Sequence, residues 1–266
     1  MLPNKVTTQN YFTRDHWIVY SGVLLLFLFG WSYMGYMGWA MQNMDIVEMW
    51  MPPRAGTAAW TLYDFWMLFL MWAVMMIAMM VPSVLPMVTL FVTVSQNKRK
   101  LGQQYVPTFI FLLGYLIVWI LFSVAISVVQ YPLHTAGLLN PMMDSRSYLL
   151  SGSILVLAGL YQWTPLKDAC LHQCRTPMTF LMTRWRDGQG GAIKMGMQHG
   201  LFCVGCCWAL MAVMFAVGVM NVLWMIAIAV FVLLEKISWF SAMLFRGISG
   251  LALVVWGTYW LSLYPW

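Results

Sequence analysis

The stretch FWMLFLMWAVMMIAMMVPSVLPMVTLFVTV, residues 65–94, runs for 30 residues without a charged side chain. A helix needs about 20 apolar residues to cross the hydrocarbon core of a bilayer. Residues 65–94 therefore predict a membrane-spanning helix that is long enough to tilt or kink. Pro82 and Pro86 do not argue against this helix, because membrane helices tolerate proline.

Similar apolar runs recur along the whole chain of 266 residues, of which 62% are hydrophobic and 8% are charged. A soluble domain carries roughly 25% charged residues, so a soluble fold with one anchor is excluded. The basic residues are scattered through loops, which argues against nucleic-acid binding. The sequence predicts an all-α integral membrane protein, a single polytopic domain over residues 1–266. Its bundle of about seven transmembrane helices is expected at residues 17–38, 65–94, 106–129, 148–164, 197–217, 221–234 and 247–263.

Lysine and arginine are concentrated in alternate loops, which predicts the orientation of the bundle. If the N-terminus is cytoplasmic, twelve of the 14 basic residues lie on the inner side and only Arg54 and Arg146 lie outside. The C-terminus is then expected outside. The polar, basic segment 165–194 is expected in the cytoplasm, together with residues 98–100.

The sequence HGLFCVGCCW, residues 199–208, opens the fifth predicted span. A helix advances about 100° per residue, so these side chains share one face of about 100° of arc. Soft thiolates and imidazole bind Cu(I), zinc or iron–sulfur centres, and neighbouring glycines would let another helix approach. A single buried cysteine would be an ordinary small apolar residue, but this stripe favours a metal or redox site. The expected ligands are His199, Cys203, Cys206 and Cys207.

A second group of cysteines follows the fourth predicted span. Cys170 and Cys174 are four residues apart and share a face if this segment is helical. His172 would then point elsewhere, so it ranks below the two cysteines as a secondary metal ligand. All five cysteines of the chain fall between residues 170 and 207, which argues against a disulfide framework. The predicted topology puts both groups on the cytoplasmic side, where they can form one metal site. An amphipathic interfacial helix with incidental cysteines is the alternative.

Methionines form two stripes that would provide secondary metal ligands, because thioethers bind Cu(I) without losing a proton. One stripe would leave the membrane outward, and the other lies within the second span. Packing is the favoured interpretation of methionine at helical spacing, and metal binding is the alternative. The first stripe is Met34, Met37, Met41 and Met44, and the second is Met75, Met76 and Met79.

Glu235 is an ionisable residue at the inner end of the sixth predicted span. It can orient a metal ligand as a hydrogen-bond acceptor. An interfacial charge is the favoured alternative, because Lys236 follows it directly.

Several motifs resemble an uncharacterised bacterial family described as predicted metal-binding integral membrane proteins. The resemblance rests on YQWTPLK at 161–167 with Cys170 and Cys174, on the motif around His199 and Cys203, and on GVMN at 218–221 and LEK at 234–236. It covers most of the chain from the second span onward. It implies metal handling, with copper as the expected metal and zinc or another soft metal as the alternative, in the cytoplasmic (inner) membrane of a bacterium.

The leading hypothesis is therefore a membrane copper-handling protein that binds, transfers or delivers Cu(I), with a metallochaperone or membrane metalloenzyme subunit as partner. The first alternative is a membrane thiol- or quinone-linked oxidoreductase that uses Cys203 and Cys206. Against it, membrane thiol oxidation belongs to the oxidising face, and these cysteines are expected on the cytoplasmic face. The second alternative is an accessory subunit of a membrane metalloenzyme complex.

Overall fold

The computed structural model describes residues 14–43, 45–46, 48, 50–53, 60–102, 106–140, 143, 145–237 and 242–264. Met44 and Arg54 lie outside the described residues. Within them the chain forms nine α-helices, which confirms the expected all-helical fold. The helices are α1 (Arg14–Gln42), α2 (Leu62–Lys100), α3 (Thr108–Thr135), α4 (Tyr148–Gln162), α5 (Pro165–Arg175), α6 (Pro177–Arg184), α7 (Gly188–Val217), α8 (Val222–Ile237) and α9 (Ala242–Ser262).

Five helices of the described chain, α1, α2, α3, α7 and α9, are long and apolar enough to cross a membrane. A sixth span results if α4 and α5, which bend by 64° at a short break, form one broken span. These helices identify a multi-pass membrane protein. Every span expected from the sequence falls on a helix, but α4 has 15 residues and α8 has 16. At 1.5 Å per residue both are shorter than the roughly 30 Å hydrocarbon core, so the count of seven stays a prediction.

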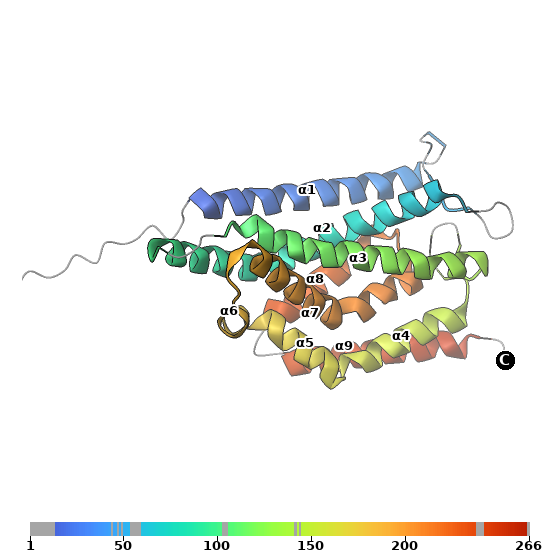
Figure 1. Ribbon diagram of the computed structural model, residues 1–266. Helices are drawn as coiled ribbons and strands as arrows, with labels where there is room; N and C mark the ends of the chain where they lie inside the picture. Colours follow the sequence, from blue (N-terminus) through green and yellow to red (C-terminus); the bar gives the residue numbers. More distant parts are fainter. Residues whose placement is uncertain are drawn as a thin grey trace, which may run out of the picture.

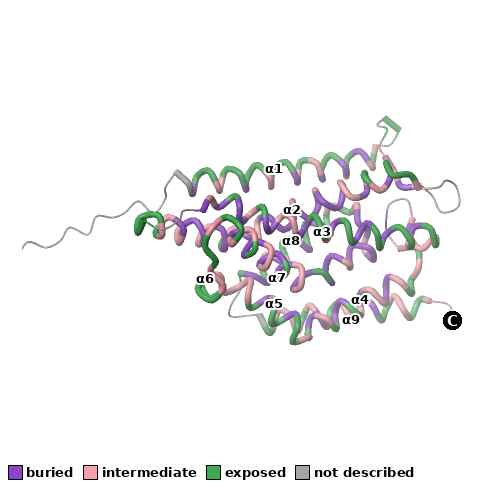
Figure 2. The backbone as a smooth tube through the Cα atoms, viewed as in Figure 1, coloured by how far each residue is buried: buried purple, intermediate pink, exposed green. Residues whose placement is uncertain are grey.

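The helices run along a common direction, with α2, α3, α7 and α8 between α1 on one side and the α4–α9 pair on the other (Figure 1). Burial follows this order, because buried residues concentrate on the middle helices while α1 exposes much of its surface (Figure 2). In the apolar windows of α2 and α7, 67% and 61% of residues are buried, against 17% in α1. The two inner helices form the core, and α1 offers its outer face to lipid.

The helix α2 continues through both prolines. Proline has no N–H, so Pro82 leaves the carbonyl of Ala78 without its helical donor. The indole N–H of Trp31 on α1 donates to that carbonyl at 3.2 Å. A neighbouring helix thus satisfies the freed backbone group, which explains why α2 tolerates proline here.

The helix α7 begins at Gly188 rather than near residue 197, so the expected cytoplasmic segment is largely helical. Several glycines between residues 188 and 196 make this part of the sequence look like a loop. Packing overrides that local tendency, because Ala192 and Met195 are fully buried. A Cβ at Gly196 would overlap the carbonyl of Phe111 on α3, which confirms the expected close helix approach.

A bend between α4 and α5 turns the chain across α7. Thr164 caps the N-terminus of α5, because its hydroxyl accepts a hydrogen bond from the Lys167 amide at 3.3 Å. Pro165 occupies the first turn of α5. Proline is favoured there because its missing N–H would have no helical partner. The carboxylate of Asp168 in the same turn binds Arg246 of α9 at 2.6 Å. The helix α5 is therefore fixed at both α4 and α9.

Candidate metal site

Cys203 of α7 is fully buried and forms the centre of the candidate site. Its backbone carbonyl accepts hydrogen bonds from the thiols of Cys206 at 3.1 Å and Cys207 at 2.9 Å. Both later thiols therefore turn back along the helix toward Cys203. The three cysteines expected on one stripe of the helix do face one buried region.

The helix α5 adds a fourth thiol to this region. Cys174 of α5 lies close enough to Cys203 and Cys206 of α7 for its thiol to interact with theirs. Cys170 sits differently, because a Cβ at Gly205 would lie 2.7 Å from the Cys170 sulfur. That sulfur rests on the backbone of α7, where only glycine leaves room. The structure thus brings the two groups of cysteines together, and the side chain of His172 is exposed on another face of α5.

His199 lies one turn before Cys203 on α7 and is 2% exposed. Aromatic rings surround its imidazole, with centroids of Phe180, Tyr115 and Phe111 at 5.5, 5.9 and 6.2 Å. Its Nδ1 atom is buried and has no hydrogen-bond partner among the described residues. A buried imidazole nitrogen without a partner is uncommon in a native structure, so His199 retains an unused donor or acceptor beside the thiols.

Three polar side chains from other helices also converge on Cys203, and sequence reasoning missed them. The Lys236 ammonium lies 2.9 Å from the Cys203 sulfur and donates to the Ser83 hydroxyl at 2.8 Å. The Tyr115 hydroxyl lies 3.2 Å from the same sulfur. The site is therefore built by α2, α3, α7 and α8 together, with Cys174 of α5.

A buried ion pair connects α5 to α8 next to this site. Lys167 and Glu235 are 0% and 1% exposed, and their charged groups lie 2.8 Å apart. The Lys167 ammonium also donates to the Gln162 side chain, and the Arg175 guanidinium donates to the Glu235 carbonyl. Glu235 is thus a buried partner of α5 rather than the interfacial charge favoured from the sequence. Its carboxylate binds Lys167 instead of a candidate metal ligand.

The methionine stripes are mostly buried. Met34 and Met37 of α1 are 3% and 8% exposed, and Met41 is partly buried near the end of that helix. Met75, Met76 and Met79 of α2 are each no more than 2% exposed. Burial fits the packing role, and it also leaves these thioethers inside the bundle rather than in lipid.

At the same end of the bundle as α5, the end of α2 is fastened to the start of α7. The Lys98 ammonium and the Trp185 indole N–H each donate to Asp187 Oδ1 at 2.8 Å. These two hydrogen bonds stabilise the carboxylate and lower the pKa of Asp187.

Among the described residues, no group of three or more His, Cys, Asp or Glu side chains is already arranged around one metal position. The thiols contact each other and a cation instead of facing an open point. The donor set nevertheless fits a soft metal ion as cargo, because all five cysteines are free and His199 has an unused nitrogen. The thiol side chains would have to rotate toward one point to receive the ion.

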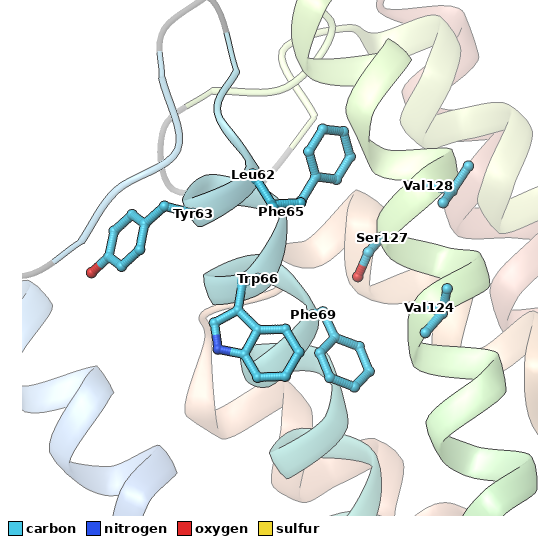
Figure 3. A pocket seen from close by; sticks show the side chains of 8 residues that line it. All are labelled: Leu62, Tyr63, Phe65, Trp66, Phe69, Val124, Ser127 and Val128. Carbon is cyan, nitrogen blue, oxygen red and sulfur yellow. The ribbon is translucent and has the colours of Figure 1, made fainter.

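One surface hollow lies away from these sulfur atoms. It is formed by the first turns of α2 and the second half of α3, and its lining is aromatic and aliphatic apart from Ser127 (Figure 3). Cys203 lies beside Ser83, much further along α2. The hollow therefore offers no soft ligand and plays no part in the site.

Comparison with known proteins agrees with the chemistry of this donor set. A family model described as PpoB2, copper chaperone, matches residues 69–260. No curated protein and no solved structure matches the chain. The family match covers most of the chain and includes every cysteine together with His199, Glu235 and Lys236. The chain therefore belongs to the PpoB2 copper chaperone family, and this membership indicates copper handling.

Proposed function

We propose that this protein is a membrane copper carrier that binds Cu(I) at the thiols around Cys203 and passes it to a partner protein. The observation that carries the proposal is the turn of the Cys206 and Cys207 thiols back toward Cys203 on α7, with Cys174 of α5 close to this cluster. It brings together two cysteine groups from different helices, three buried thiols of α7 and two partly buried thiols of α5. Family membership makes copper the expected cargo.

Cu(I) suits this region better than zinc does. Cu(I) accepts two or three soft ligands, whereas structural zinc wants a closed tetrahedral set of four. Cys203 with Cys174 and either Cys206 or Cys207 would supply such a small set, and His199 is the reserve ligand. Cys170, which packs against Gly205, would bind only after it moves.

We place the site near the cytoplasmic leaflet of a bacterial inner membrane. The support is the bias of twelve basic residues to two, which favours seven spans with a cytoplasmic N-terminus. In this topology α4 and α8 each cross the membrane despite their 15 and 16 residues, and residues 1–266 form one domain. The bend of α5 then lies at the inner side together with Cys174.

The buried methionines would supply copper to the thiols. Met34 and Met37 lie along α1, and Met75 and Met79 lie in α2 between the outer end of the bundle and Ser83. Cu(I) would pass from thioethers near the exterior to thiols near the cytoplasm. The receiving partner would be a metallochaperone or a subunit of a membrane metalloenzyme.

Elemental analysis of the protein purified in mild detergent tests this proposal directly. Copper should be present in a fixed ratio to protein and should be lost when the thiols are alkylated first, because alkylated sulfur no longer ligates as a thiolate. Preparations loaded with zinc under the same conditions provide the comparison. A protein that never retains copper, and instead carries a titratable disulfide between Cys203 and Cys206, would favour the oxidoreductase.

A further inference from the structure

Lys236 fills a cation position at the centre of the candidate site. Its ammonium lies between the Cys203 sulfur at 2.9 Å and the Ser83 hydroxyl at 2.8 Å, and the residue is 9% exposed. An ammonium has three donors and no acceptor, so the sulfur must accept from it. A positive charge thus already rests against the sulfur at the centre of the cysteine cluster.

The neighbouring carboxylate does not neutralise this charge. Glu235 precedes Lys236, but both of its carboxylate oxygens bind Lys167, at 2.8 and 2.9 Å. The Tyr115 hydroxyl near Cys203 is neutral and also donates to the Met80 carbonyl at 3.2 Å. Of the two side chains that accept a hydrogen bond from Lys236 within the described residues, Ser83 is neutral, so the Cys203 sulfur is the one that can balance the charge.

We infer that the Lys236 ammonium holds the place of Cu(I) in the copper-free protein and exchanges with the arriving ion. This inference rests on the proposed function, and copper remains Cu(I) throughout. At Cys203 one monovalent cation leaves the sulfur as another binds, so the charge against that sulfur is unchanged, and each further thiol that ligates Cu(I) as a thiolate releases its proton to solvent. Conservation of charge matters here because an uncompensated charge in a dry interior is costly.

The position of Lys236 in α8 allows this exchange. It is the last residue but one of the helix, which ends at Ile237. A lysine near a helix end can keep its aliphatic stem in place while its ammonium turns outward to the polar interface. When the ammonium leaves, the Ser83 hydroxyl remains in place and can turn toward the cysteine sulfurs.

The exchange would give the site two properties that a carrier needs. A divalent ion such as Zn(II) brings one more positive charge than the ammonium it displaces and needs one more deprotonated thiol to offset it, so Cu(I) is favoured. The tethered ammonium also competes with bound copper for the sulfur, which promotes release to a partner. Lys236 is therefore a specificity-determining residue rather than a metal ligand.

Site-resolved labelling of lysines in the unmodified protein tests the exchange. Detergent-purified protein is treated with a small amine-acylating reagent, with and without one equivalent of Cu(I), and labelled lysines are quantified by mass spectrometry. Labelling of Lys236 should rise severalfold on copper binding, whereas labelling of the exposed Lys194 should not change. If copper binds in a fixed ratio and Lys236 stays unlabelled, the exchange is wrong. If copper does not bind at all, the proposed function fails with it.

The metal preference of a Lys236→Gln variant gives a second, independent test. Glutamine keeps much of the length and polarity but removes the charge. Competition between Cu(I) and Zn(II) should show the preference for Cu(I) falling by about tenfold or more, because one charge at close range in a protein outweighs that factor. Lys194→Gln, which removes an exposed charge, is the matched control and should keep the preference. An unchanged preference in Lys236→Gln would overturn the role in specificity.

Discussion

The Lys167 ammonium lies 2.8 and 2.9 Å from the two carboxylate oxygens of Glu235, which are separated from it by 68 positions in the chain. Both residues are buried, so each ion depends on the other for its stability in a medium that solvates charges poorly. The pair connects α5, which carries Cys174, to α8, which carries Lys236. It therefore fixes the two elements that meet at Cys203.

We expect Glu235→Gln to destabilise the protein and to loosen α5. The change leaves the Lys167 ammonium buried without its counter-ion, which typically costs roughly 3–5 kcal/mol. Thermal unfolding in detergent should shift downward, and Cys174 should react faster with a thiol reagent. The double variant Lys167→Leu with Glu235→Leu should regain most of the lost stability, because apolar side chains can replace a buried pair. A double variant less stable than Glu235→Gln would show that the pair is not an isolated unit.

Replacing Cys203 should abolish copper binding more completely than replacing any other cysteine. Cys203→Ser keeps the size but removes the soft donor at the centre of the cluster, beside which the Cys206 and Cys207 thiols bind the Cys203 carbonyl. Outer-shell changes at metal sites already cost roughly 10–100-fold in affinity, so the loss of a ligand should cost at least that much. Cys170→Ser is the matched control, because its sulfur rests on Gly205 and should matter less. Full copper content in Cys203→Ser, measured by elemental analysis, would rule out the site.

The outer methionine stripe should be needed only when copper is scarce. Changing Met34, Met37, Met41 and Met44 together to leucine conserves volume, and such swaps usually cost less than about 1.5 kcal/mol each. Copper loading in cells should fall at limiting copper and recover when copper is abundant. The same exchange at Met178 and Met182, two exposed methionines of α6, is the control. Normal loading at limiting copper would assign the stripe to packing alone.

Most of the fold could be predicted from the sequence, because a membrane helix is recognised by its local composition. A long apolar stretch such as residues 65–94 has few alternatives once the bilayer is the solvent. The start of α7 was missed because its glycines resemble a loop, and the packing that supports a helix there, such as the close approach of Gly196 to Phe111 of α3, lies far away in the sequence. The bend at Pro165 was equally hidden, since its direction depends on contacts with α7 and α9.

Part of the candidate site could also be predicted from the sequence. This part is the stripe from His199 to Cys207 and the expectation that Cys174 lies near it. Helical periodicity is a local rule, so it predicts which side chains share a face. The rotation of one helix against another is set by packing across the whole bundle. The contact between Lys236 and Cys203 and the pairing of Lys167 with Glu235 depend on that rotation, and no local pattern predicts them.

Single-cysteine labelling should place the α5–α6 end of the bundle in the cytoplasm. On a background without the native cysteines, Arg99→Cys and Ile46→Cys form a matched pair, because both positions are exposed, Arg99 lies in the last turn of α2, and Ile46 precedes the other end of that helix. An impermeant thiol reagent applied to intact cells should label position 46 and leave position 99 unlabelled until the cells are opened. The basic residues 98–100 predict this result, since positive charge is retained on the inner side. Labelling of position 99 in intact cells would reverse the orientation and move the thiols around Cys203 to the outer leaflet. Copper would then have to enter from the opposite side.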